Sequence, residues 1–196
     1  HPRITEDLFT RDLFRDFELL FDWRIAEGGN TGLKYRIQDK VFLAEQARQP
    51  FEALVNFSLE HRSGRRAKGQ EYVIGFEYQL IDDQRHPDAK RGGIHQAGAL
   101  YDMVAPSREA ALPAGQFNHS RLVVRGSHVE HWLNGVKVVD SSLDAKAVGE
   151  HSAQRWGADS PVYRLLVQQP RRECPISLQN HNDAAWFRDI KIHPLR

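Results

Sequence analysis

The sequence is short of cysteine, with a single one, Cys174, among its 196 residues. One cysteine cannot close a disulfide bond within the chain, and it leaves no cysteine-based metal site. An excess of charge of one sign is also lacking, because 27 lysine and arginine residues nearly cancel 26 aspartate and glutamate residues. No overall field therefore favours nucleic acid as a partner.

Long apolar runs and several catalytic motifs are missing too. No stretch approaches the roughly 20 apolar residues that a membrane-spanning helix needs, so we expect no membrane span. The first residues, His1–Asp7, have neither the basic start nor the apolar centre of a signal peptide. The sequence has no Gly-x-Ser-x-Gly nucleophile motif, no phosphate-binding glycine loop and no dinucleotide fingerprint, so we expect no nucleotide cofactor.

Alternation of apolar and polar residues predicts β-strands over much of the chain. From Phe17 to Ile25 every second residue is large and apolar, which indicates a strand with one buried face. Residues 27–32 then have turn chemistry, and Leu33–Ile37 resumes the extended pattern. Further β-rich runs are separated by glycine, proline, asparagine or aspartate: Tyr72–Ile81, Ser120–Arg125, Val129–Leu133, Val136–Val139, Val162–Gln168, Ile176–Gln179 and Ala185–Ile192.

Turn and helix signals complete this pattern. Asn134-Gly135 predicts a two-residue hairpin of type I′, because both residue types tolerate positive φ. Only residues 39–54 have plausible helical spacing, and Pro50 limits that helix to about one or two turns. Many short strands without a β-α-β rhythm predict an all-β fold, an antiparallel β-sandwich. No repeat or linker divides the chain, so we expect a single domain over residues 1–196.

The most informative segment is the predicted strand that contains Glu77 and Gln79. In a strand these two side chains point to one side, while Phe76, Tyr78 and Leu80 point to the other. A carboxylate next to an amide suits recognition of sugar hydroxyls or acid–base chemistry, because each forms directed hydrogen bonds. A solvated outer face would show the same alternation, so the pattern leaves both interpretations open.

The spacing of acidic residues after Glu77 bears on the type of reaction. Conventional glycoside hydrolysis uses two carboxylic residues that flank the bond to be cleaved. Here Gln79 follows Glu77 on the same face, and the next acid, Asp82, comes at an odd spacing. An odd spacing puts Asp82 on the opposite face of a regular strand, so the sequence disfavours a conventional retaining glycosidase.

A second candidate segment contains Gln179 and His181, which share a face if the extended pattern continues. Histidine exchanges protons near neutral pH, although a histidine at a strand end is more often a structural hydrogen-bonding group. Arg188 is a candidate to bind an anion or a developing enolate. Simple parity groups Arg188 with Ile190 on a core face, so a role for Arg188 requires a bulge.

A loop-rich stretch offers oxygen and imidazole ligands for a divalent cation such as calcium. The residues concerned are Asp82, Asp83, His86, Asp88 and His95. Their spacing matches no defined metal motif, so the sequence by itself assigns no metal ligand.

Eight short motifs occur in order between residues 16 and 192. They are Asp16-Phe17-Glu18-Leu19, Gly29-Asn30-Thr31-Gly32, Gly75-x-Glu77-x-Gln79-x-x-Asp82, Gly98-Ala99-Leu100-Tyr101, Gly115-x-Phe117-Asn118, Leu133-Asn134-Gly135, Ile176-x-Leu178-Gln179-x-His181 and Phe187-Arg188-Asp189-Ile190. Together they resemble the 3-keto-disaccharide hydrolase family, also called the domain of unknown function 1080 family.

This resemblance implies a concanavalin A-like jelly roll, a sandwich of two curved antiparallel sheets, which agrees with the strand pattern. Members of the family usually begin with a further stretch that holds a Phe-Asn-Gly-x-x-Leu-x-x-Trp motif, and this chain is expected to enter after it. The resemblance also implies a bacterial protein that works in the periplasm or outside the cell.

The resemblance further implies a hydrolase or lyase that acts on glycosides already oxidised to a ketone at C3. That ketone acidifies the hydrogen at C2, so a base can remove the proton and expel the C1 substituent, after which water adds. Glu77 or His181 is expected to transfer the proton, and Arg188 or a bound cation to stabilise the enolate. The residues expected to contact the carbohydrate are Asn30, Arg36, Gln79, Tyr101, Gln179 and Arg188.

Two other interpretations stay open at this point. The chain is a noncatalytic carbohydrate-binding module if the same sandwich presents a polar cleft without turning a sugar over. It is a structural interaction domain of a larger cell-surface protein if it binds no sugar at all. The oligomeric state, the sugar and its linkage do not follow from the sequence.

Overall fold

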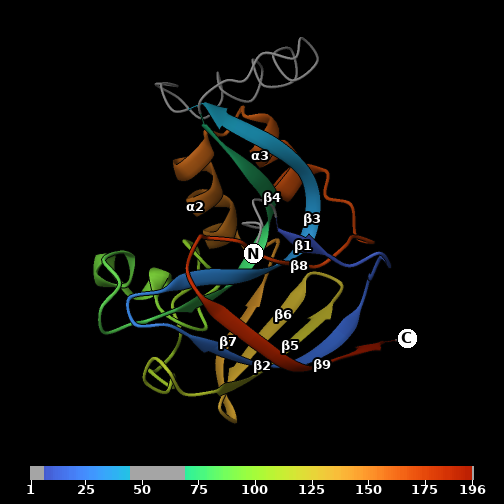
Figure 1. The fold of residues 1–196 in the computed structure, drawn as a ribbon. Helices are drawn as coiled ribbons and strands as arrows, with labels where there is room; N and C mark the ends of the chain where they lie inside the picture. Colours follow the sequence, from blue (N-terminus) through green and yellow to red (C-terminus); the bar gives the residue numbers. More distant parts are fainter. Residues whose placement is uncertain (1–6, 45–68, 196) are drawn as a thin grey trace.

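The computed structural model describes residues 7–44 and 69–195, which form two antiparallel β-sheets packed face to face (Figure 1). The four-stranded sheet has the order β1 (Leu8–Phe9), β8 (Ser177–Leu178), β3 (Asn30–Ala44) and β4 (Gly69–Ile81). The five-stranded sheet has the order β7 (Val136–Ser142), β6 (His128–Leu133), β5 (Asn118–Arg125), β2 (Phe17–Ile25) and β9 (Ala185–Pro194). The prediction of an all-β antiparallel sandwich is confirmed.

The hydrophobic core lies between the inner faces of the two sheets. In β2 every second residue is buried along the whole strand, as the alternation predicted. Phe21 of β2 meets Tyr78 of β4 edge to face, with 5.7 Å between the ring centres. Burial of each such side chain contributes about 1.5–3 kcal/mol of transfer free energy, so this layer of contacts stabilises the face-to-face packing.

One histidine, His131, lies in the core and is kept neutral by its burial. The Nε2 atom of His131 lies 3.0 Å from the hydroxyl of Tyr35, and its Nδ1 atom lies 2.9 Å from the carbonyl of Gly98. Because a carbonyl only accepts, Nδ1 donates to Gly98 and Nε2 accepts from Tyr35. Burial lowers the pKa of His131 to about 4, so the ring fills the core without a charge.

The hairpin between β6 and β7 has the predicted turn. Asn134 has a φ of 50° and Gly135 a φ of 81°, the left-handed values that a type I′ turn requires. The Asn134 side chain donates to the carbonyl of Ala110 at 2.7 Å and accepts from the amide of His119 at 2.8 Å. The turn therefore also fastens the preceding loop to the sheet.

β3 contains a large bulge that the sequence did not reveal. Tyr35 pairs with Phe76 and Asp39 pairs with Ile74, so residues 36–38 all lie opposite Gly75. A Cβ atom on Gly75 would lie 3.1 Å from the Tyr35 carbonyl oxygen, so glycine leaves room for the bulge. The expectation of a helix over residues 39–54 is wrong for residues 39–44, which continue β3, and residues 45–54 lie outside the described residues.

The two described α-helices and a π-helical turn follow β7 in the sequence and lie beside β4 (Figure 1). They are α2 (Lys146–Trp156), α3 (Pro161–Tyr163) and a π-helical turn, η3 (Arg164–Gln168). The prediction of a strand over Val162–Gln168 is therefore wrong. Val162 and Leu166 are buried four residues apart, which is a helical spacing, and Ser160 caps the helix start by accepting from the amide of Tyr163.

The loop between β4 and β5 contains two short 3-10 helices, η1 (Asp88–Arg91) and η2 (Gly93–His95). Within the described residues, no helix has both the length and the apolar character needed to cross a membrane.

Candidate functional site

A polar cleft of about 260 Å³ opens on the face of the four-stranded sheet that points away from the core. Its floor and walls are formed by residues of the sheet, of the loop after β4 together with α2, and of the segment after β8, and Asp7 just before β1 completes the lining. The lining residues are Asp7, Asn30, Lys34, Tyr72, Val73, Glu77, Gln79, Tyr101, Arg155, Gln179, Asn180 and His181. The cleft thus gathers side chains that are far apart in the sequence.

The floor of the cleft holds a buried ion pair. Glu77 on β4 is 9% exposed and Lys34 on β3 is 1% exposed, and their Oε2 and Nζ atoms lie 3.7 Å apart. Lys34 also donates to the carbonyl of Val73 at 3.3 Å and lies over the ring of Tyr72. Each of the two buried side chains therefore has a partner of opposite charge.

Gly32 on β3 makes the space that the Glu77 carboxylate occupies. A Cβ atom at Gly32 would lie 2.2 Å from Oε1 of Glu77, far inside van der Waals contact. Gln79 lies beside them and is 1% exposed. The orientation that satisfies its amide points the nitrogen at the carbonyl of Thr31 (3.1 Å) and at Oε1 of Glu77 (3.3 Å). The carboxylate therefore has a defined direction into the cleft.

Tyr101 forms part of the wall contributed by the loop after β4. The amide of Tyr101 donates to the carbonyl of Glu77 at 3.0 Å, which fastens this loop to β4. The Tyr101 hydroxyl donates to Oδ2 of Asp88 at 2.7 Å. Burial, together with the nearby Asp88 carboxylate, raises the pKa of Tyr101 above its usual value, so the phenol stays a hydrogen-bonding group and not a base.

Arg155 enters the cleft from the last turn of α2. Its Nη1 atom lies 3.1 Å from Oδ2 of Asp102, and its side chain is 28% exposed. The guanidinium lies over the ring of Tyr101, 5.3 Å from its centre. Trp156, the next residue, packs against Tyr72 of β4 in a tilted arrangement with 4.8 Å between ring centres, and this contact holds the end of α2 against the sheet.

Burial opposes the positive charge of Arg155, but the nearby Tyr72, Asp102, Tyr101 and Glu77 outweigh it and raise the pKa of Arg155. Arg155 is therefore a permanent cation at the edge of the cleft.

The third wall follows β8. The amide of Gln179 donates to the carbonyl of Gly32 at 2.8 Å, and its carbonyl accepts from the Thr31 hydroxyl at 2.7 Å. The side-chain Oε1 of Gln179 is buried and has no hydrogen-bond partner within the described part of the chain. His181 stands at the rim, where its side chain is 49% exposed, and its Nδ1 lies 4.0 Å from Oδ2 of Asp183.

Six of the eight residues singled out from the sequence line this cleft: Asn30, Glu77, Gln79, Tyr101, Gln179 and His181. The side-by-side direction of Glu77 and Gln79, expected from strand parity, is confirmed, because Phe76, Tyr78 and Leu80 are buried in the core.

Arg36 and Arg188 do not line the cleft. Arg36 is the first residue of the β3 bulge and has a φ of 52°, which turns its side chain toward the β5–β6 turn. Arg188 is exposed on β9, where its Nε lies 3.1 Å from Oδ2 of Asp22. The strand pair of β2 and β9 has a register shift at this point, and Asp189 has a positive φ of 52°. The regular alternation that would put Arg188 and Ile190 on a core face is therefore interrupted, and both side chains are exposed.

The five candidate metal ligands in the loop after β4 are engaged in hydrogen bonds that shape the loop. Asp82 accepts from the amides of Gly28 and Gln84, at 2.8 and 3.0 Å, and Asp83 accepts from the amide of Ala97 at 2.8 Å. The same holds for the other three: His86 accepts from the Asp88 amide, Asp88 binds Tyr101 and Arg91, and His95 contacts Asp102.

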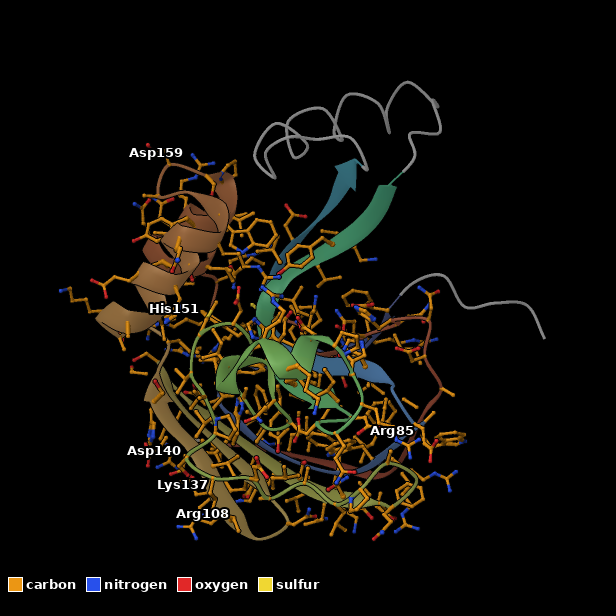
Figure 2. The ribbon with its side chains drawn as sticks, turned by 90° about the vertical axis from the view of Figure 1, so that its left-hand side faces the viewer. Arg85, Arg108, Lys137, Asp140, His151 and Asp159 are labelled. Carbon is orange, nitrogen blue, oxygen red and sulfur yellow. The ribbon has the colours of Figure 1, made fainter. Side chains whose placement is uncertain are left out.

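In the described ranges, three ligand atoms lie within 4.8 Å of one another only at His128, Glu130 and Asp140. This group lies on β6 and β7, and Lys137 reaches the carboxylates of both Glu130 and Asp140. Figure 2 shows Lys137 and Asp140 side by side on the ribbon edge below α2, which carries His151. A lysine ammonium thus already pairs with both carboxylates of this group.

The sequence interpretation missed Lys34, Tyr72 and Arg155. Lys34 lies between Leu33 and Tyr35 in the predicted strand Leu33–Ile37, so the parity argument used for Glu77 would have found it. Arg155 had no such signal, because α2 was not expected and its position against Tyr72 depends on tertiary packing.

Comparison with known proteins identifies the family of the chain. The sequence model of the 3-keto-alpha-glucoside-1,2-lyase-like domain matches residues 2–193. A relative from Bacteroides thetaiotaomicron, named 3-keto-disaccharide hydrolase, is 28% identical over 200 residues, which cover 96% of this chain and 62% of the relative. The chain therefore spans somewhat less than two thirds of the length of that relative.

Two crystal structures from Parabacteroides distasonis, described as those of candidate glycosyl hydrolases, have a similar fold. The first has a TM-score of 0.69 at 24% identity and covers 97% of this chain and 76% of the other. The second has a TM-score of 0.65 at 21% identity and covers 97% and 83% of the two chains. At these identities the likeness establishes the fold.

Proposed function

Because this chain belongs to the 3-keto-disaccharide hydrolase family, we propose that it cleaves glycosides whose sugar carries a ketone at C3, by elimination followed by hydration. One observation supports this most directly. Glu77, Gln79, Lys34 and His181 come from three separate strands or segments and converge on one polar cleft. That cleft presents a carboxylate, an imidazole and two cations to a ligand of sugar size.

The proposed reaction begins with loss of the proton at C2, which the C3 ketone acidifies. The carboxylate of Glu77 takes this proton, and the electrons of the C2–H bond form an enolate with its charge on the C3 oxygen. Glu77 suits this role because Gly32 and Gln79 fix its direction, and because Lys34 compensates its charge at 3.7 Å.

The enolate then collapses to the ketone, a C1–C2 double bond forms and the C1–O bond breaks. His181 gives a proton to the departing oxygen, since it stands at the exposed rim where a leaving group exits. Water adds across C1–C2, with OH at C1 and a proton at C2, so that the net result is hydrolysis. This route needs one base and one acid, in keeping with the single carboxylate of the Glu77–Gln79 pair.

The positive charge that stabilises the enolate is assigned to Arg155. Its guanidinium reaches the cleft from α2 and is permanently charged, whereas Arg188 lies on the other sheet. The hydroxyls of the keto-sugar are held by Asn30, Gln79, Tyr101 and Gln179, among which Gln179 offers an acceptor, Oε1, with no protein partner in the described residues.

Incubation of the protein with a 3-keto-disaccharide tests this proposal. We expect release of a monosaccharide and, in deuterium oxide, incorporation of deuterium at C2. Glu77→Gln should lower the rate by about 10²–10⁴-fold, the usual contribution of a positioned general base, and His181→Ala should slow release of the leaving sugar. Glu130→Gln, on β6 away from the cleft, is the matched control and should leave the rate unchanged.

Two outcomes would contradict the enzyme assignment. Saturable binding of the keto-sugar without released monosaccharide, unaltered by Glu77→Gln, would make the domain a carbohydrate-binding module. Absence of any binding to this sugar or to a glycan array would favour a structural interaction domain.

A further inference from the structure

A second cavity, of about 250 Å³, lies at the other side of the bulge in β3 and shares no lining residue with the cleft. It is bordered by Arg36, by Phe76 of β4, by Ser127 in the β5–β6 turn, by Leu166 of η3 and by the arginines at positions 171 and 172. The lining combines cationic groups with apolar ones. None of these residues has a part in the reaction proposed above.

Arg36 is the buried cation of this cavity. It is 4% exposed, and its Nη2 donates to the carbonyl of Gly126 at 2.7 Å and lies 3.3 Å from Oδ1 of Asp16. Its Nη1 is buried and has no hydrogen-bond partner among the residues that the structure describes. A buried guanidinium normally uses its donors in a fixed fork. Because Arg36 lines the cavity, its unpartnered nitrogen is a donor for an acceptor that binds there.

The segment that carries the two other arginines is held near Arg36 by hydrogen bonds of the Gln38 side chain. The side chain of Gln38, which is fully buried in the bulge, donates to the carbonyl of Arg171 at 2.9 Å and accepts from its amide at 2.7 Å. The same Gln38 nitrogen donates to the carbonyl of Arg36 at 2.8 Å. The position of this segment beside Arg36 is therefore built into the fold, while the Arg171 and Arg172 side chains stay exposed.

The charges of this region do not cancel. Three arginines line the cavity together with a single carboxylate, Asp144. Asp16 is engaged by Arg36 and by the amide of Gly126 at 2.8 Å. Burial lowers the pKa of Arg36, Asp16 raises it, and the positive charge of Arg172 lowers it again. An additional negative group in the cavity would offset both the desolvation of the Arg36 guanidinium and its repulsion by Arg172.

We propose that this second cavity is a binding site for a small ligand with an oxyanion head group, either a carboxylate or a phosphate ester. The head group accepts from Nη1 of Arg36 and from the guanidinium groups of Arg171 and Arg172, which present planar donor pairs that match such anions. The rest of the ligand packs against the apolar wall that Phe76 and Leu166 form. The site is separate from the cleft, so its function does not depend on the reaction proposed above.

Titration of the whole chain with sodium phosphate and, separately, with sodium glucuronate tests the site, with ionic strength held constant by sodium chloride. Calorimetry and the thermal unfolding midpoint are the readouts, because a ligand that binds only the folded state raises the midpoint. Saturable binding of either anion supports the site. Tighter binding of phosphate points to a phosphate ester, and tighter binding of glucuronate to a carboxylate.

Variants locate the binding. Arg172→Ala removes an exposed side chain, so it should fold normally and bind the anion about tenfold or more weakly, as expected for a lost charge-assisted contact. The matched control is Arg108→Ala, which should bind like the unaltered protein. Arg108 is also an exposed arginine, but it does not line the second cavity, and it lies at the opposite end of the molecule from Asp159 (Figure 2).

The proposal is overturned if neither anion gives saturable heat or a midpoint shift beyond that of sodium chloride. It is also overturned if Arg155→Ala abolishes binding while Arg172→Ala does not, since the anion would then occupy the cleft. Cleavage of the keto-sugar by Arg172→Ala should equal that of the unaltered chain, so failure of the anion site and failure of the enzyme assignment are distinguishable.

Discussion

Lys34 and Arg36 lie two residues apart on β3, but Lys34 lines the cleft and Arg36 lines the second cavity. Lys34 points into the cleft and lies 3.7 Å from the Glu77 carboxylate. Arg36 lies in the bulge, points toward the β5–β6 turn and keeps one buried nitrogen without a partner in the described chain. The same kind of strand position thus leads to two different electrostatic environments.

The difference indicates which ligands the two hollows can accept. In the cleft each buried or half-buried cation has a carboxylate close by, Glu77 for Lys34 and Asp102 for Arg155. A site with paired charges favours a neutral, hydroxyl-rich ligand that is held by directed hydrogen bonds. In the second cavity arginines outnumber carboxylates, which favours an anion.

The comparison predicts its largest effect at Lys34. Lys34→Met removes the ammonium that is paired with Glu77. We expect a loss of about 3 kcal/mol in the free energy of unfolding, the lower end for a broken buried pair because the cleft opens to water. Urea unfolding measures this. The double variant Lys34→Met/Glu77→Gln should recover most of the loss, and Arg172→Ala in the cavity should show none. Equal stability of Lys34→Met and the unaltered protein would refute the pairing.

A second prediction concerns Arg155, the cation that α2 brings to the cleft. Arg155→Met should lower kcat for the keto-sugar by about 10²–10³-fold, the range for removal of one group that stabilises an oxyanion. Arg155→Lys should restore part of the rate, because it keeps the charge. Steady-state kinetics distinguishes this role from simple binding, for which KM would change and kcat would not.

The third prediction tests the space beneath Glu77. Gly32→Ala puts a methyl group at a point that the Glu77 carboxylate occupies, so the carboxylate must turn away. We expect kcat/KM to fall by about 10²-fold, as for a misplacement of about 1 Å. The unfolding midpoint should fall as well, because the turned carboxylate no longer lies beside the buried Lys34 ammonium.

Gly149→Ala is the control for this substitution. Gly149 lies in α2, and an added Cβ would meet only ordinary contacts at 3.7 and 3.8 Å, so this variant should keep its activity and gain stability. An active Gly32→Ala protein would show that the direction of Glu77 is not needed.

Much of the sandwich was predictable because its signals are local. The alternation in β2 and the Asn134-Gly135 turn were recognised from neighbouring residues alone, and the structure confirms both. The direction of Glu77 and Gln79 followed in the same way. The strand predicted at Val162–Gln168 failed because β-branched residues in a short run do not distinguish a buried strand from a buried helix.

The sequence by itself therefore determined the two sheets, the polar side of β4 and the resemblance to a family, since each depends on side-chain periodicity or on residue order. Only the tertiary structure decided that Arg36 leaves the cleft, that Arg155 enters it and that His181 stands at its rim. The physical reason is that these positions depend on contacts between segments far apart in the chain. They are the bulge opposite Gly75 for Arg36, the packing of Trp156 against Tyr72 for Arg155, and the hydrogen bonds of Gln179 with Thr31 and Gly32 for the segment that carries His181.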